Sequence, residues 1–176
     1  MNRIVIESIR NRFFLSFWEI YESSFPLCER RSQEDQIRIF ALNYYRLEAW
    51  VENNNLLGFI GWWDLKDTRY VEHYAIHPDC RSEGYGSKFL KEWMEDSDKL
   101  VLLEIEPVKD EMTQRRQNFY HRLGFIDSEI PHCHPPYHKG MKPVNLWLLT
   151  YPNGLTPEIC QKFREKQRKV IIPPFE

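Results

Sequence analysis

Hydrophobic positions in the first part of the chain recur with two different periods. Residues 3–9 alternate between apolar and polar side chains, which predicts a short strand. Aromatic residues then recur at helical spacing and predict a helix with one core-facing stripe: Phe13, Phe14, Phe17, Trp18 and Tyr21. Ser32, with Asp35 three residues later, resembles a capping box and predicts the start of a second helix.

The next apolar runs predict a hairpin followed by a third strand. Residues 44–51 and 56–65 are the two arms, because the polar tract 52–55 between them supplies side chains that tolerate turn conformations. Residues 70–76 form another apolar run. Pro78 disfavours helix at His77, so this strand is expected to end before the following helix begins.

Strands and helices alternate through the rest of the chain. The pattern predicts a helix from about Gly86, a strand over 100–106, a helix from Thr113 to Leu123, strands over 124–130 and 144–151 around a loop at 131–143, and a helical run from Thr156 to about Lys169. The expected fold class is therefore α/β (α+β), as one domain over residues 1–176 with a helical extension over 155–176.

Composition excludes several classes of protein. The 176 residues carry 24 Lys and Arg against 26 Asp and Glu, and this net charge of -2 gives no overall attraction to nucleic acid or to anionic lipid. No apolar run approaches the roughly 20 residues that span a bilayer, and the first residues lack the apolar core of a signal peptide. The four cysteines form no C-x-x-C pair. We expect a cytoplasmic protein with reduced thiols.

The segment Arg81-Ser82-Glu83-Gly84-Tyr85-Gly86 places two glycines between a strand and a helix. Such a turn directs backbone N–H groups at one point, with the positive end of a helix dipole behind them, and its natural guest is a phosphate group. It is neither the dinucleotide fingerprint, because Phe89 replaces the third glycine, nor a nucleoside triphosphate loop. The alternative is a simple turn with Arg81 in solvent.

This segment matches the R/Q-x-x-G-x-G/A signature of the GNAT N-acetyltransferases, and residues 119–125, FYHRLGF, resemble their second signature. The two motifs lie on either side of a strand, as in that family, and the resemblance covers about residues 1–151. It implies a GNAT fold: a mixed, mostly antiparallel central sheet of about six to seven strands, flanked by helices, with a splayed parallel pair expected at 70–76 and 100–106.

The resemblance also implies acetyl-CoA as co-substrate. In the family, backbone N–H groups of the loop bind the pyrophosphate of acetyl-CoA, and the pantetheine arm lies between the splayed strands. The residues expected to contact it are Ala75, Ile76, Arg81, Ser82, Glu83, Gly84, Tyr85, Gly86 and Ser87. Thr113 and Arg116 stand where many members have Asn and Ala, so the usual Asn contact does not carry over. Arg116 is a candidate for a CoA phosphate, or a surface charge.

Acetyl transfer requires a neutral amine and benefits from a proton donor near the CoA sulfur. Tyr120 matches the tyrosine that similar enzymes place against the thiol, with a packed phenol as the alternative. Glu104 matches the glutamate of the peptide N-terminal acetyltransferases. Alternation puts Leu102, Glu104 and Glu106 on one face, which we expect to point away from the core. Glu72 and His73 are competing bases, because other branches of the family take theirs from that strand.

The loop H-C-H-P-P-Y-H at 132–138 contains three histidines and a thiol. One clustered loop rarely provides closed tetrahedral geometry, so we expect no metal. The loop resembles the acceptor end of some bacterial GNAT proteins, which makes His134, Tyr137 and His138 candidate acceptor-binding residues.

Two hypotheses about function follow. The first is an enzyme that moves an acetyl group from acetyl-CoA to a primary amine of a small molecule or peptide, by direct attack in a ternary complex. The second is a non-catalytic acyl-CoA-binding or regulatory module with the same fold. Neither needs nucleic acid or a membrane, and the resemblance is compatible with a homodimer.

Overall fold

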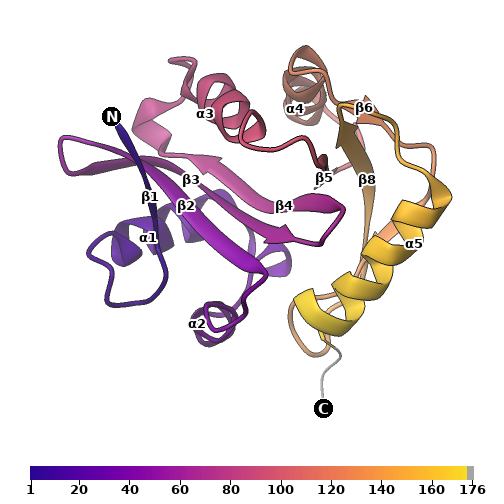
Figure 1. Cartoon of the computed structure of the whole chain (residues 1–176), viewed down its shortest axis with the longest axis horizontal. Coiled ribbons are helices and arrows are strands. Elements are labelled where there is room, and N and C mark those ends of the chain that lie inside the picture. Colours follow the sequence, from indigo (N-terminus) through magenta and orange to yellow (C-terminus); the bar gives the residue numbers. More distant parts are fainter. Residues whose placement is uncertain (174–176) are drawn as a thin grey trace. The chain divides into compact units, whose positions relative to one another are not determined.

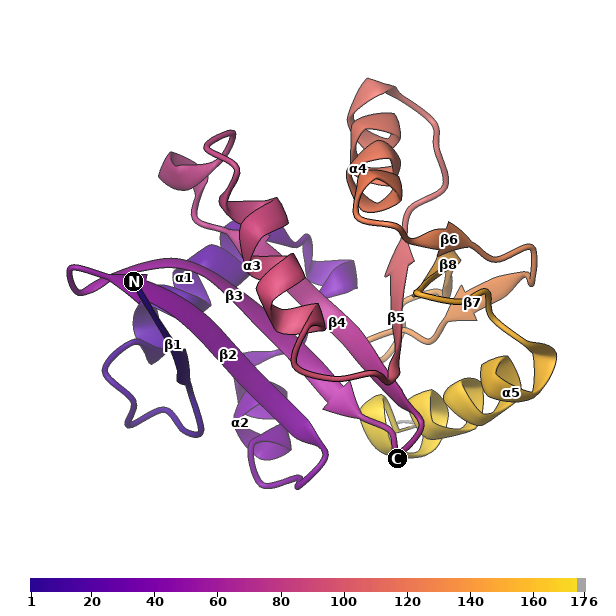
Figure 2. The same cartoon turned by 45° about the horizontal axis from the view of Figure 1, so that its top comes forward.

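A computed structural model describes residues 1–173, so the last three residues of the expected extension 155–176 lie outside the described part (Figures 1 and 2). The chain forms two compact units. The first comprises Met1–Asp64 and Tyr70–Asp98, and the second comprises Leu65–Arg69 and the chain from Lys99 onward. No helix among the described residues is long and apolar enough to cross a membrane.

The first unit contains strands β1 (Asn2–Val5), β2 (Tyr45–Glu52), β3 (Asn55–Asp64) and most of β4 (Thr68–Ile76), in that spatial order. β2 pairs antiparallel with both β1 and β3, which confirms the expected hairpin. Asn53 and Asn54 form its turn with φ of 50° and 63°. Such positive values are typical of a type I′ turn, whose twist matches that of the flanking strands.

Helices cover both faces of this sheet. They are α1 (Phe14–Ser24), η1 (Leu27–Glu29), α2 (Gln33–Ile39), η2 (Pro78–Cys80) and α3 (Tyr85–Met94). The Ser32 side chain accepts the Asp35 N–H, as the capping pattern predicted.

Helices α1 and α3 lie on opposite faces of this sheet (Figure 1), and one aromatic contact holds each of them there. Phe17 of α1 meets Phe59 of β3 edge to face, with ring centroids 4.8 Å apart. Trp50 of β2 stacks on Phe89 of α3 at 4.6 Å. Trp50 lies opposite Gly58 in the β2–β3 register, so it points to the other side of the sheet from the adjacent Phe59. The expected aromatic stripe of α1 therefore belongs to the core.

The second unit contains β5 (Leu100–Ile105), β6 (Ile126–Asp127), β7 (His132–His134) and β8 (Val144–Tyr151), with helices α4 (Glu111–Arg122) and α5 (Pro157–Lys166) and the π-helical turn η3 (Gln167–Ile171). β8 pairs antiparallel with β5, β6 and β7. The described residues thus contain eight strands, one more than expected, because β7 forms inside the expected loop 131–143.

The expected boundaries differ from the observed ones in two other places. The strand expected over 124–130 is only Ile126–Asp127. The helix expected from Thr113 begins at Glu111, because Asp110 is its N-cap and Thr113 belongs to the capping box rather than to the start of the helix.

Candidate functional site

The turn between β4 and α3 adopts a conformation that only a few residue types accept readily. Ser82 has φ of 67° and Gly84, the N-cap of α3, has φ of 83°. A Cβ on Gly84 would meet no heavy atom within 4 Å, so the backbone conformation rather than crowding favours glycine there. Residues 81–84 are exposed, and the turn is therefore accessible to a ligand.

Side chains of the first unit hold this turn in place. Arg81 donates from Nε to the Ile76 carbonyl at 3.1 Å and from a terminal nitrogen to the Ser24 hydroxyl at 3.1 Å. Tyr74 donates to the Gly86 carbonyl at 2.6 Å. Arg81 therefore joins α1 to the end of β4 and does not simply extend into solvent.

The N-terminus of α3 can bind an anion. Its first intrahelical hydrogen bond runs from the Lys88 N–H to the Gly84 carbonyl at 3.1 Å, so the N–H groups of Tyr85, Gly86 and Ser87 precede the helical ladder. These groups and the helix dipole favour negative charge at this end. The geometry suits a phosphate group.

Close packing of β3 fixes the end of β4. A Cβ on Gly58 would lie 2.8 Å from Ile76 Cδ1 and 2.9 Å from the Ala75 carbonyl oxygen, closer than packed atoms allow. Glycine at position 58 thus lets the two strands approach at the residues that precede the turn. Ala75 itself is buried.

Glu72 of β4 is the carboxylate of a buried ion pair. Its side chain is 0% exposed and that of Arg31 is 4% exposed, with Arg31 Nη1 2.6 Å from Glu72 Oε2. Trp63 donates its indole N–H to the same oxygen at 2.8 Å. Burial raises the pKa of Glu72, but Arg31, His73 and the hydrogen bonds outweigh it and hold the pKa below its ordinary value. Glu72 is thus ionised and already partnered inside the unit.

His73 is also enclosed. Its Nε2 lies 2.8 Å from the Glu29 carbonyl oxygen and 3.4 Å from the Tyr21 hydroxyl, and its ring packs against Tyr21 and Phe25. The histidine connects β4 to the segment after α1. Glu72 and His73 therefore both hold this unit together, and their role as base stays a prediction.

Tyr120 lies on α4, packed edge to face against Phe119 at 5.0 Å and Phe125 at 5.5 Å. Burial raises the pKa of its phenol to about 12, against a smaller opposite effect of Arg116. The phenol therefore carries its proton at neutral pH, as a proton donor must.

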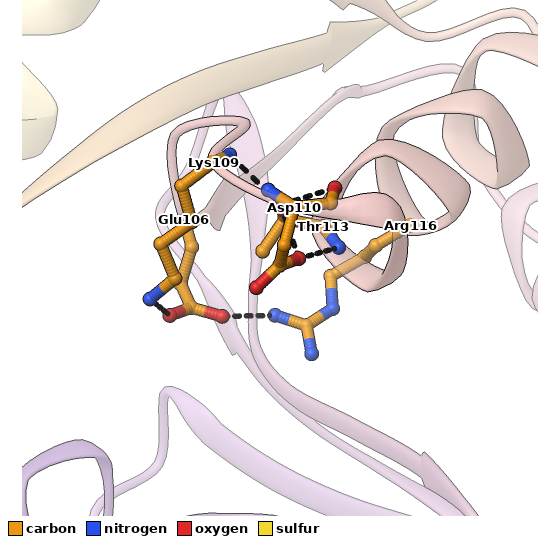
Figure 3. Close-up of polar contacts among 5 residues, drawn as sticks. All are labelled: Glu106, Lys109, Asp110, Thr113 and Arg116. Carbon is orange, nitrogen blue, oxygen red and sulfur yellow. Dashed lines mark hydrogen bonds and ion pairs between the residues drawn. The ribbon is translucent and has the colours of Figure 1, made fainter.

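Polar contacts organise the start of α4 (Figure 3). Asp110 Oδ1 accepts the Thr113 N–H at 2.8 Å, and Thr113 Oγ1 accepts the N–H groups of Lys109 at 3.0 Å and Asp110 at 3.1 Å. This box accounts for the threonine at position 113. Thr113 is fully buried and uses its hydroxyl to begin the helix.

Arg116 is paired with Glu106 across the same region, with Nη1 2.8 Å from Oε2 (Figure 3). Lys109 Nζ lies 2.9 Å from the other carboxylate oxygen. The hydrogen bond from Lys109, followed by that from Arg116, holds the pKa of Glu106 below its ordinary value despite partial burial. Arg116 is 40% exposed, and its contact with a CoA phosphate stays a prediction.

Glu104 of β5 lies in a second polar cluster. His132 Nε2 forms a short contact with Glu104 Oε1, Gln167 Nε2 donates to the same oxygen at 3.0 Å, and His134 Nε2 lies 3.7 Å from Oε2. The side chains of Glu104 and His132 are 6% and 1% exposed. Leu102 on the same face is fully buried, so the expectation that this face points away from the core is wrong. The helices and β7 of the second unit cover it.

His134 and Tyr137, two of the expected acceptor residues, lie together with ring centroids 4.9 Å apart. Both are buried, and His138 is half-buried. Within residues 1–173, no group of three or more His, Cys, Asp or Glu is arranged to hold a metal ion.

Sequence reasoning missed three residues at these sites: Arg31, His132 and Gln167. The H-x-H spacing at 132–134 was a usable signal, because alternate residues of a strand share a face. Arg31 and Gln167 carried no such signal, since each meets its carboxylate across more than 40 positions of sequence.

Comparison with known proteins supports the resemblance to GNAT acetyltransferases. Residues 45–127 match the model of an acetyltransferase (GNAT) domain, a range that includes the glycine turn, Glu104 and Tyr120. A GNAT-family protein from Bacteroides thetaiotaomicron is 28% identical, with a TM-score of 0.89 and 98% of each chain covered. Among curated proteins, none matches the sequence.

More distant structures share the fold. The ribosomal-protein-S18-alanine N-acetyltransferase from Escherichia coli is 13% identical with a TM-score of 0.62, over 89% of this chain and 97% of that one. Arabidopsis thaliana Naa50, in complex with the bisubstrate analogue CoA-Ac-MVNAL, is 15% identical with a TM-score of 0.61, over 87% and 100% of the two chains. These matches confirm the expected GNAT fold, and residues 45–127 match an acetyltransferase (GNAT) domain.

Proposed function

We propose that this protein transfers an acetyl group from acetyl-CoA to a primary amine of a small molecule or peptide, by direct attack in a ternary complex. The observation that carries the proposal is the left-handed turn at Ser82 and Gly84, which leads into the N-terminus of α3. The N–H groups of Tyr85, Gly86 and Ser87, which precede the helical ladder, suit the pyrophosphate of acetyl-CoA. Naa50, which has this fold, is bound to a CoA–peptide conjugate, in keeping with such a co-substrate.

The co-substrate would contact the end of β4 and the turn. Ala75 and Ile76 precede the turn, and residues 81–87 form the proposed pyrophosphate site; Arg116 of the second unit is a separate candidate for a CoA phosphate. To bind a phosphate, the Arg116 guanidinium must either release Glu106 or donate hydrogen bonds to Glu106 and the phosphate at the same time.

The chemical step needs one base and one acid. Glu104 takes the proton of the acceptor ammonium, and the neutral amine then attacks the thioester carbonyl. A carbon–nitrogen bond forms and the carbon–sulfur bond breaks. Tyr120 protonates the departing CoA sulfur; burial raises the pKa of its phenol to about 12, so the phenol carries the proton to be donated at neutral pH. The second proton of the attacking nitrogen and the proton held by Glu104 are lost to solvent, and Tyr120 regains a proton from solvent, so each transfer releases one net proton.

The acceptor site is assigned to the second unit, where His134 ends β7 and Tyr137 and His138 follow it within the segment 131–143. The relatives' names cover a ribosomal-protein alanine and a peptide conjugate, so peptidic amines are within the reach of this fold. A homodimer is part of the proposal.

Calorimetric titration with acetyl-CoA tests the site. Wild type should bind with micromolar affinity, and Gly86→Trp should abolish binding because the indole covers the N–H groups that precede the helical ladder. Gly154→Trp is the matched control, because no heavy atom lies within 4 Å of a Cβ at that position. No binding by wild type would contradict the proposal.

A screen of amine acceptors then separates the enzyme from a non-catalytic acyl-CoA module. Release of CoA together with an acetylated amine supports the transferase. Tight acetyl-CoA binding without turnover on small amines, polyamines, aminoglycosides and peptides would favour the module.

A further inference from the structure

The register of the second unit gathers three polar side chains on one face of its sheet. Glu104 lies opposite Leu148, while His132 and His134 lie opposite Leu146 and Val144 of the same strand, β8. Residues two apart on a strand share a face, so the three polar side chains project to the same side. α5 and η3 pack there, through Phe163 against His132 and through Gln167 against Glu104.

The position of the proton between Glu104 and His132 follows from this burial. A carboxylate oxygen and an imidazole nitrogen in short contact must share a proton, because two lone pairs would repel each other. The other nitrogen, Nδ1, is buried and has no hydrogen-bond partner among residues 1–173. If the neutral ring is protonated on Nε2, only a lone pair remains on Nδ1. Burying an unpaired lone pair costs less free energy than burying an unpaired N–H group. His132 is thus the donor and Glu104 the carboxylate.

Gln167 adds a second donor to the same oxygen. It is the first residue of the π-helical turn that follows α5, and it is almost fully buried. π-Helical turns are uncommon and frequently occur at functional sites. A neutral amide and a neutral imidazole thus both donate to Oε1 of Glu104.

We propose that His132, assisted by Gln167, is a positioning residue for the general base of acetyl transfer: its Nε2–H fixes the Glu104 carboxylate and keeps it ionised, ready to accept the ammonium proton. The inference rests on the proposed function and names a residue that the family resemblance did not supply. The carboxylate faces two titratable groups from β7, His132 and His134, and one uncharged donor from η3, Gln167. Hydrogen bonds to an ionised carboxylate favour that form, so losing a donor makes the carboxylate easier to protonate.

The test compares pH–rate profiles of kcat with one acceptor amine. His132→Phe keeps a ring beside Phe163 but removes the donor. Its acidic limb should move upward by about one pH unit, a tenfold change in the ionisation constant, with a corresponding loss of kcat below neutral pH. His132→Gln keeps an amide donor and should restore most of the profile. His121→Gln is the control, because His121 pairs with Asp127 on the surface of α4 and β6.

A readout without turnover accompanies the kinetics. Nitrogen-15 NMR of histidine in the acetyl-CoA-free protein should show the proton of His132 on Nε2, and Glu104→Gln should shift that resonance. A resonance indifferent to Glu104→Gln, or a His132→Phe profile identical to wild type, would overturn the inference while leaving acetyl transfer in place. If instead Glu104→Gln keeps full turnover, the base assignment itself fails, and the positioning role fails with it.

Discussion

Replacing Arg31 with methionine should destabilise the protein strongly, because Glu72 would remain buried without its charged partner. The two side chains are 4% and 0% exposed and their charges are 2.6 Å apart. At an effective dielectric constant near 20 this separation corresponds to about 6 kcal/mol of attraction. The Trp63 hydrogen bond stays and recovers part of the loss. We therefore expect the free energy of unfolding to fall by about 3–5 kcal/mol at pH 7.

The loss should depend on pH in a defined direction. In wild type the pKa of Glu72 is lowered in the folded state, so its contribution is present above the unfolded pKa and disappears as the pH falls through the folded value. In Arg31→Met, burial without the cation raises the folded pKa, so acid stabilises the folded variant relative to neutral pH. The difference in unfolding free energy between the two proteins should therefore shrink as the pH falls.

Urea denaturation at several pH values measures this difference. Arg31→Met combined with Glu72→Leu removes both charges and should recover most of the stability lost in Arg31→Met, giving a large coupling energy in the double-mutant cycle. A loss below about 1 kcal/mol in Arg31→Met at pH 7 would refute the reasoning, because the pair would then behave as a solvated one. An unchanged loss at acidic pH would refute the assignment to Glu72.

Three further predictions concern the proposed site. Tyr120→Phe should lower kcat by about 100-fold while leaving acetyl-CoA affinity unchanged, as measured by steady-state kinetics and calorimetry; equal turnover would remove Tyr120 as the acid. Gly58→Ala should reduce the unfolding free energy by about 1–3 kcal/mol, because its Cβ would lie 2.8 Å from Ile76 Cδ1; a neutral result in urea denaturation would mean that the strands separate easily. Arg116→Ala should raise the pKa of Glu106 toward its ordinary value, observable by NMR titration, since one of its two cationic partners is lost; an unchanged titration would show that Lys109 alone holds the shift.

Features determined by nearby residues were predictable from the sequence. The polar tract 52–55 predicted the hairpin because its asparagines accept the left-handed conformations that the turn uses. The glycine pair at 84 and 86 predicted the turn before α3 for a related reason, since Gly84 is the left-handed N-cap. Ser32 predicted the start of α2 through a contact only three residues away.

Features determined by distant residues were not predictable. β7 has three residues and follows a proline, too short for alternation to stand out, and it forms because β8 offers an edge to pair with. The environment of Glu104 was mispredicted for the same reason. Alternation grouped Glu104 with Leu102 on one face of β5, but the histidines and Gln167 that cover this face come from later elements. A local pattern cannot show which later segment will pack on a strand.

The capping box at the start of α4 has a consequence for insertions and deletions. Asp110 and Thr113 form reciprocal hydrogen bonds within four residues of sequence, so the position at which the helix begins depends only on this short segment. Residues inserted between Glu106 and Lys109 would lengthen a loop and leave the rotation of Tyr120 about the helix axis unchanged. One residue inserted between Thr113 and Tyr120 would turn the phenol by about 100° around that axis. The orientation of Tyr120 thus depends on the number of residues between the capping box and Tyr120. Insertions before the box should leave this orientation intact, whereas insertions after it should change it.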